Sequence, residues 1–143
     1  MSPADLSPEL SKHFRALRMW LPLVHLGVGP FRAALEEKLL LARYFHAGAE
    51  AAGFEVGPSP ELSVATYRWA PNGASPEETD RFNQALVDAM RRDGRLFISS
   101  TLLDGRFTLR MAALAFRTHR RTIDLALRVL TEQVAALEGR GHA

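Results

Sequence analysis

Arg110 is the residue of this sequence whose type and neighbours point most clearly to chemistry. An Asp104-Gly105 dipeptide shortly before it predicts a tight two-residue hairpin turn. The strand pairing that follows from this turn places Arg110 directly opposite Ser99 and diagonal to Thr101. A guanidinium group beside hydroxyl donors suits a carboxylate or a phosphate. The sequence therefore predicts an anion-binding cluster on one face of the hairpin.

The two faces of this hairpin differ in character. The predicted core face is mostly apolar, and it carries Leu96, Ile98, Ser100, Leu102, Phe107, Leu109, Met111 and Ala113. The opposite face carries Arg110 and the hydroxyl side chains. Antiparallel sheets commonly leave one face to solvent. A second interpretation therefore stays open, in which Arg110 is solvated or pairs with a nearby acidic side chain.

Helical and extended segments follow one another in a pattern typical of an α+β fold. Helices are predicted from Ser7 to about Leu21, where Pro22 should end or kink the first one, and over residues 30–52, 75–94 and 118–137. Strands are predicted over residues 54–56, 62–70, 96–103 and 106–114. The predicted architecture is two N-terminal helices followed by a small antiparallel-sheet domain with its helices on one face. We expect a helical segment over residues 1–53 and a small domain over residues 54–143.

Composition excludes several classes of site. The chain has no cysteine, so disulfides and thiolate metal sites are impossible, and its five histidines show no metal-ligand spacing. No signal-peptide pattern and no membrane-length apolar run is present, which predicts a cytoplasmic protein without a membrane partner. A net charge of +2 and a short Arg117, Arg120, Arg121 cluster without interleaved aromatic residues predict no nucleic-acid partner.

Two stretches carry a resemblance to a known family. Residues 11–20 (Ser-Lys-His-Phe-Arg-Ala-Leu-Arg-Met-Trp) resemble the helix that follows the cofactor lysine in pyridoxal-phosphate (PLP) dependent decarboxylases of aromatic amino acids. Residues 94–118 resemble the hairpin, the Leu-Arg strand and the Arg-Thr helix start of the same family. Order and spacing agree from about residue 11 to residue 137. The sequence departs from the pattern at Arg18, Pro22 and Ala115-Phe116.

The resemblance implies a fold and a role for Arg110. The fold would be that of the C-terminal domain of fold type I PLP enzymes, with residues up to about Gly53 belonging to the end of the large domain and a connecting helix. In glutamate-type members the arginine of the Leu-Arg strand helps bind the substrate carboxylate, and Leu109-Arg110 is the matching pair here. This makes Arg110, Ser99 and Thr101 the candidate substrate-binding residues. In aromatic-type members the alternative is a structural role for the same arginine.

The resemblance also implies PLP as the cofactor of the complete enzyme, held by a lysine upstream of the matching segment. The chain contains only Lys12 and Lys38. Lys12 replaces an arginine of the helix motif, and Lys38 is predicted on the solvated, polar side of its helix. We therefore expect no catalytic, cofactor-binding or metal-binding residue in this chain, and no PLP bound to the chain alone.

Two hypotheses about partners follow. In the first, the chain is the C-terminal part of a carboxy-lyase that is active only with a PLP-binding large domain. In the second, it is a non-catalytic interaction or oligomerisation module derived from that family. Exposed apolar side chains are expected at Met19, Trp20, Leu39, Leu40 and Leu41, and they predict a dimer or higher homo-oligomer.

Overall fold

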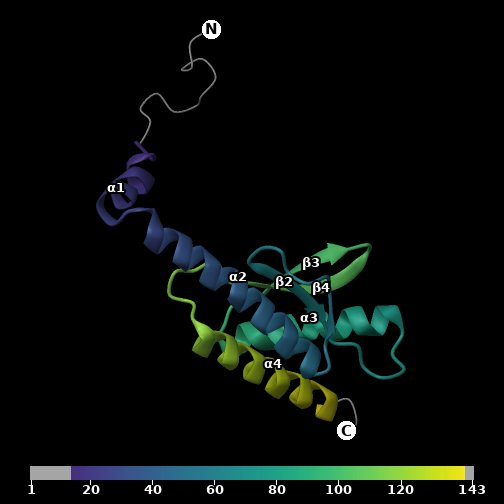
Figure 1. Cartoon of the computed structure of the whole chain (residues 1–143). Helices are drawn as coiled ribbons and strands as arrows, with labels where there is room; N and C mark the ends of the chain where they lie inside the picture. Colours follow the sequence, from purple (N-terminus) through teal and green to yellow (C-terminus); the bar gives the residue numbers. More distant parts are fainter. Residues whose placement is uncertain (1–13, 141–143) are drawn as a thin grey trace. The chain divides into compact units, whose positions relative to one another are not determined.

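The structure is a computed structural model that describes residues 14–140, and its elements follow the predicted order (Figure 1). The helices are α1 (Leu17–Leu26), α2 (Val28–Ala51), α3 (Pro76–Asp93) and α4 (Arg120–Arg140). The strands are β1 (Glu55–Val56), β2 (Val64–Arg68), β3 (Ser99–Leu103) and β4 (Arg106–Ala112). The predicted helix start at Ser7 lies outside the described residues. The α+β fold class is confirmed.

The chain divides into two compact units, Met1–Ala34 and Leu35–Ala143. The first unit contains α1 and the beginning of α2. The second contains the rest of α2, the sheet, α3 and α4. The predicted division after residue 53 concerns a correspondence with the domains of larger enzymes, and it stays a prediction.

The sequence predicts that Pro22 ends or kinks the first helix near Leu21. Helix α1 runs through Pro22, so the predicted end is wrong, and the kink stays a prediction. Proline lacks the N–H that would bond to the carbonyl four residues earlier, which removes one hydrogen bond but leaves later ones intact. The helix ends instead at Gly27, whose positive φ of 76° suits glycine and whose N–H donates to the carbonyl of Leu23 at 2.9 Å.

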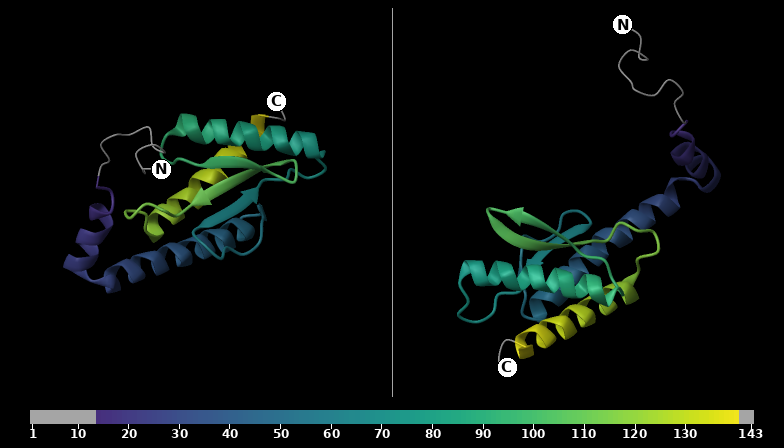
Figure 2. Two further views of the ribbon diagram at one scale, coloured as in Figure 1. Left: turned by 90° about the horizontal axis from the view of Figure 1, so that it is seen from above. Right: turned by 180° about the vertical axis from the view of Figure 1, so that it is seen from behind.

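A four-stranded antiparallel sheet in the order β1-β2-β4-β3 organises the second unit. Three helices cover one face, and the right-hand view of Figure 2 shows α3 and α4 beneath the sheet. The core between the layers contains Leu41, Ala42, Phe45, Ala49, Ala65, Tyr67, Leu86, Met90, Leu109, Met111, Ile123, Val129, Leu130 and Val134. These residues come from all three helices and both central strands, so the opposite sheet face has no helix over it in this unit.

The hairpin has the predicted register. Leu103 pairs with Arg106 and Ser99 pairs with Arg110. Asp104 and Gly105 have positive φ values of 49° and 75°, as a two-residue turn of this type requires. One expectation for the core face fails, because Leu102 is 66% exposed. It lies next to the turn, whereas the buried apolar residues of the hairpin lie toward the other end.

Helix α3 begins with the predicted capping box. The hydroxyl of Ser75 accepts a hydrogen bond from the N–H of Glu78 at 3.2 Å, and the Glu78 carboxylate accepts from the N–H of Ser75 at 2.7 Å. Pro76 occupies the first helical position, where its missing N–H removes no intrahelical bond. Gly94 ends the helix in a left-handed conformation.

Lys38 is buried, so the prediction that it is solvated is wrong. Its Nζ donates to the carbonyl oxygens of Thr118 at 2.6 Å and Phe116 at 3.3 Å, and pairs with the Glu37 carboxylate at 2.9 Å. The segment before α4 folds against α2 and presents these carbonyls. A buried ammonium group is stable there because oxygen atoms surround it.

The apolar side chains expected at the surface are only partly found there. Met19 and Trp20 are 70% and 58% exposed, and Leu40 is also exposed. Leu39 is half-buried. Leu41 belongs to the core, so the expectation was wrong for this residue. Its side chain lies on the stripe of α2 that also buries Ala42 and Phe45.

Candidate functional site

Arg110 lies on the central strand β4, flanked on both sides by hydroxyl residues. It pairs with Ser99 on β3 and with Thr66 on β2. Directly paired residues of an antiparallel ladder point to the same face. The guanidinium Nε donates to the Ser99 hydroxyl at 3.4 Å, and the side chain is exposed. Arg110 therefore extends from the sheet face that the helices leave open.

A second row of polar residues lies next to this one. Thr101 pairs with Thr108, so it points to the same open face. Arg68 follows the Tyr67–Leu109 pair by one residue and thus lies beside Thr108. The structure brings the three predicted residues Arg110, Ser99 and Thr101 onto one face, although only Ser99 has a hydrogen bond with Arg110. Thr66 and Arg68 join them there.

Arg68 is a largely buried charged residue on this face, with a side chain only 11% exposed. Its Nε lies 3.5 Å from the Glu55 carboxylate, and its Nη2 lies 3.6 Å from the Asp80 carboxylate. Asp80 also accepts a hydrogen bond from the N–H of Phe107 at 3.0 Å. Nε and Nη1 of Arg68 are buried without a hydrogen-bond partner within residues 14–140. These contacts tie β1, β2, α3 and β4 together at one end of the open face.

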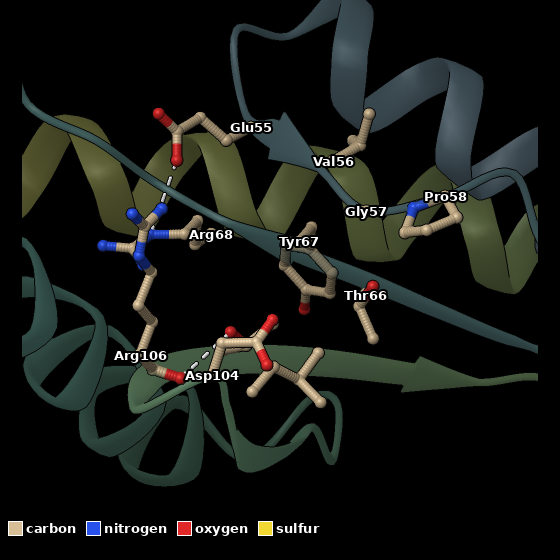
Figure 3. Close-up of a pocket in the computed structure, with 11 residues that line it drawn as sticks. Glu55, Val56, Gly57, Pro58, Thr66, Tyr67, Arg68, Asp104 and Arg106 are labelled. Carbon is tan, nitrogen blue, oxygen red and sulfur yellow. Dashed lines mark hydrogen bonds and ion pairs between the residues drawn. The ribbon is translucent and has the colours of Figure 1, made fainter.

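A pocket of about 480 Å³ opens beside Arg68 and the hairpin turn (Figure 3). It is lined by Glu55, Val56, Gly57, Pro58, Thr66, Tyr67, Arg68, Leu103, Asp104, Arg106 and Thr108. Arg110 does not line this pocket. The open face thus carries two polar features, the Arg110 row and the pocket.

Sequence reasoning missed Thr66 and Arg68. Their spacing of two within the predicted strand 62–70 placed them on one face, which is the only local signal. Nothing in the sequence indicated that β2 pairs with β4, and this pairing is what brings them beside Arg110 and Thr108.

The lysine within the described part of the chain does not suit covalent attachment of PLP. Lys38 Nζ is engaged by two carbonyl oxygens and by Glu37, and its side chain is 7% exposed. A lysine that attacks an aldehyde must instead present an accessible neutral amine. Lys12 lies outside the described residues. Residues 14–140 contain no cluster of histidine, aspartate or glutamate that could hold a metal ion.

Two side chains outside the Arg110 row, Glu37 and Tyr67, have shifted pKa values. Hydrogen bonds from His119 and Lys38 lower the pKa of the Glu37 carboxyl group below its ordinary value. Burial raises the pKa of the Tyr67 hydroxyl far above its ordinary value, because the ionised form would lose its hydration. Neither group faces Arg110, so both are features of the scaffold.

Solved structures share the fold of this chain. The chain superposes on Oryza sativa TDC bound to PLP and tryptamine with a TM-score of 0.83 at 19% identity, covering 96% of this chain and 29% of that one. It superposes on Catharanthus roseus tryptophan decarboxylase in complex with L-tryptophan with a TM-score of 0.78 at 21% identity, covering 87% and 27%. The fold is therefore that of one part of a PLP-dependent decarboxylase.

Sequence relatives agree with this fold. Tryptophan decarboxylase 2 of Oryza sativa subsp. japonica is 28% identical over 137 residues, which are 95% of this chain and 28% of that protein. Aromatic-L-amino-acid decarboxylase of Bacillus atrophaeus is 30% identical over 132 residues, or 89% and 28%. No protein-family profile matches the chain. The chain matches the C-terminal portion of the group II PLP-dependent amino-acid decarboxylases, and it spans just over a quarter of the length of these relatives.

No helix within residues 14–140 is long and apolar enough to cross a membrane.

Proposed function

We propose that this chain supplies the C-terminal small domain of a PLP-dependent amino-acid decarboxylase, and that Arg110 binds the substrate carboxylate with help from Ser99 and Thr101. The observation that carries the proposal is the position of Arg110. It extends from the central strand, on the open face of the sheet, with a hydroxyl residue paired on either side. A planar guanidinium can donate two parallel hydrogen bonds to a carboxylate, and neighbouring hydroxyls can complete the shell.

The role of Arg110 in this proposal is binding and orientation. Decarboxylation breaks the bond between the α-carbon and the carboxylate, releases carbon dioxide and leaves an electron pair on the α-carbon, which then takes up a proton from an acid. PLP, when bound to the complete enzyme, serves as the electron sink for such a reaction. A guanidinium stays protonated in proteins and cannot transfer that proton. It can hold the carboxylate in a fixed direction, which favours the reactive geometry.

The partner implied by this proposal is a large domain that carries the PLP-binding lysine, either in the same polypeptide or in a separate one. The relatives are about three and a half times as long as the matching region, which leaves room for such a domain in them. A cytoplasmic location is part of the proposal, since a chain without cysteine needs no oxidising compartment to fold.

A hybrid enzyme tests the proposal. The C-terminal region of the Bacillus atrophaeus enzyme is replaced by this chain, and amine formation from aromatic L-amino acids and from L-glutamate is measured. We expect activity that the upstream region alone does not show. A folded hybrid that binds PLP, seen as a visible absorption band lost on borohydride reduction, but forms no amine from any amino acid would contradict the proposal.

A second candidate function is a non-catalytic oligomerisation module, which the exposed Met19 and Trp20 favour. The purified chain, mixed with a separately expressed large domain of the relative, discriminates between the two. Co-elution of the two proteins supports the role as part of an enzyme. A chain that self-associates but does not bind the large domain supports the oligomerisation module.

A further inference from the structure

Strand β3 forms one edge of the sheet in the second compact unit (Figure 1). The strand order β1-β2-β4-β3 pairs it with β4 on its inner side, and no strand of residues 14–140 pairs with its outer side. An edge strand presents unpaired N–H and C=O groups to any extended chain that approaches it. The outer side of β3 is therefore a surface on which a further strand can pair.

The alternation of backbone groups identifies the residues that face this outer side. The N–H of Ala113 donates to the carbonyl of Ser63, just before β2, at 2.8 Å, so odd-numbered residues along β4 turn their backbone groups toward β2. Even-numbered residues of β4 then face β3, where they pair with odd-numbered residues. The remaining residues of β3, Ser100 and Leu102, turn their N–H and C=O groups outward. Ile98, just before the strand, continues this row.

This edge lacks the devices that usually prevent pairing with another chain. Charged side chains and proline are common protections of an edge strand. Residues 97–103 (Phe-Ile-Ser-Ser-Thr-Leu-Leu) contain no charged residue, no proline and no glycine. Phe97 is 85% exposed, Leu102 66% and Leu103 44%. A short uncharged segment of this composition is typical of strands that pair between chains.

The segment is symmetric in side-chain character about Ser100. Two apolar residues stand at each end and three hydroxyl residues stand in the middle. Two copies that run antiparallel about this residue place apolar side chains opposite apolar ones and hydroxyls opposite hydroxyls, and no like charges meet. The opposed pairs are Phe97–Leu103, Ile98–Leu102, Ser99–Thr101 and Ser100 with itself. An interface between identical copies must be complementary to itself, and this segment meets that condition.

We propose that β3 pairs antiparallel with β3 of a second copy of this chain, about a two-fold axis at Ser100. In this register the outward residues meet one another, Ser100 with its own copy and Ile98 with Leu102. Each such pair exchanges two N–H···O bonds. The axis is perpendicular to the sheet, so the two sheets become continuous and their open faces lie on the same side. This interface goes beyond the proposed function and does not depend on it.

Residue-resolved amide hydrogen exchange of the wild-type chain tests the pairing. Exchange is compared between tens of micromolar and millimolar protein by nuclear magnetic resonance. The amides of Ser100 and Leu102 gain an acceptor only in the pair, so we expect their exchange to slow by at least about fivefold at the higher concentration. The amide of Thr101 already faces β4 and is the internal control, with a smaller change expected.

Introduced cysteines test the register, because the chain has none of its own. Ser99→Cys chains are mixed with Thr101→Cys chains under mild oxidation. The two positions face each other in a non-hydrogen-bonded pair, where a Cα–Cα distance of about 4.5 Å permits a disulfide. We expect more of the mixed disulfide dimer than random pairing gives. Ser63→Cys mixed with Thr101→Cys is the control, and we expect no such excess.

Two variants block the edge without removing a bond of the hairpin ladder. Ser100→Pro removes the outward N–H at the axis, a position where an edge strand tolerates proline. Leu102→Lys places a charge on the edge. The concentration dependence should disappear at the amide of Leu102 in the first variant and of Ser100 in the second. A protected Thr101 amide shows that the hairpin remains folded.

Four results would overturn the proposal. Three are exchange at Ser100 and Leu102 that does not depend on concentration, a mixed disulfide yield no higher than random, and protection that survives in both variants. The fourth is protection that appears only when the large domain of the Bacillus atrophaeus enzyme is added, which would assign the edge to that domain. Self-association through Met19 and Trp20 alone leaves these two amides unprotected, so it is distinguished from the β3 interface.

Discussion

Tyr67 illustrates how one side chain combines a stabilising and a destabilising contribution. Its ring is fully buried and makes edge-on contacts with Phe45 and Phe54, at centroid distances of 5.0 and 5.7 Å. Its hydroxyl is buried without a hydrogen-bond partner in the described residues. The ring contributes favourable burial and aromatic contacts, whereas the unpaired hydroxyl has lost its hydrogen bonds to water.

We therefore expect Tyr67→Phe to be at least as stable as the wild type, with the free energy of unfolding rising by about 1 kcal/mol. Urea unfolding measures this difference. Tyr44→Phe is the control, since its hydroxyl donates to Asp124 at 2.6 Å and its removal should give no gain. A loss of more than about 1 kcal/mol in the Tyr67 variant would show that the hydroxyl has a partner.

The Tyr67 hydroxyl also makes the free energy of unfolding depend on pH. Burial raises its pKa in the folded state, so only the unfolded chain ionises as pH passes the ordinary value of 10.0. Ionisation of this hydroxyl therefore has no effect on the free energy of unfolding below that pH. The free energy of unfolding of the wild type then falls as pH rises through it, because only the unfolded chain is stabilised by ionisation. The stability advantage of Tyr67→Phe over the wild type should widen above pH 10.0.

At the scale of elements, Lys38 connects α2 to the segment that precedes α4. Replacing it with methionine keeps the stem but leaves the carbonyls of Thr118 and Phe116 without their charged donor. We expect a destabilisation of about 1–3 kcal/mol. Amide hydrogen exchange should become faster around residues 113–119 first. Uniform loss of protection across the sheet, with no larger effect in this segment, would contradict the assigned role.

The start of α3 depends on its capping box. Ser75→Ala should destabilise the protein by about 1 kcal/mol, because the N–H of Glu78 loses its acceptor. Thermal unfolding measures this, with Thr131→Ala as a control, whose hydroxyl only bonds back to the carbonyl of Leu127 within α4. An unchanged midpoint in Ser75→Ala would mean that the cap contributes nothing.

Hydrogen bonds from Ser75 lower the pKa of Glu78 from its ordinary value of 4.5. The stability that the ionised carboxylate contributes is present above pH 4.5 and is lost as pH falls through the lowered folded-state pKa. The stability difference between the wild type and Glu78→Gln should therefore shrink on acidification.

The elements show how far the sequence alone determines this fold. The Asp104-Gly105 turn sets the hairpin register locally, and the Ser75–Glu78 capping box marks the start of α3, so both are predictable. The insertion of β2 between β1 and β4 depends on contacts between distant residues, and no local signal indicated it. Arg68 and Thr66 were missed for this reason. Lys38 was misjudged because its partners are carbonyl groups some eighty residues away.

At the scale of the whole molecule, apolar exposure predicts self-association. Met19, Trp20 and Leu40 are each more than half exposed. We expect a dimer or larger oligomer by light scattering at tens of micromolar, and a shift toward the monomer in a Met19→Ser, Trp20→Ser double variant. A wild-type monomer at these concentrations would contradict this expectation.

The central claim is that Arg110 binds the carboxylate of an amino acid undergoing decarboxylation. The most direct measurement is kcat/KM of the hybrid enzyme carrying Arg110→Gln, compared with the unmodified hybrid and with an Arg91→Gln control. Arg91 is an exposed arginine of α3 that pairs with Asp88, away from the sheet. Loss of a charged hydrogen bond to the substrate predicts a fall of about 10- to 100-fold for Arg110→Gln, and no change for the control. A hybrid that retains its kcat/KM without the Arg110 guanidinium would contradict the account.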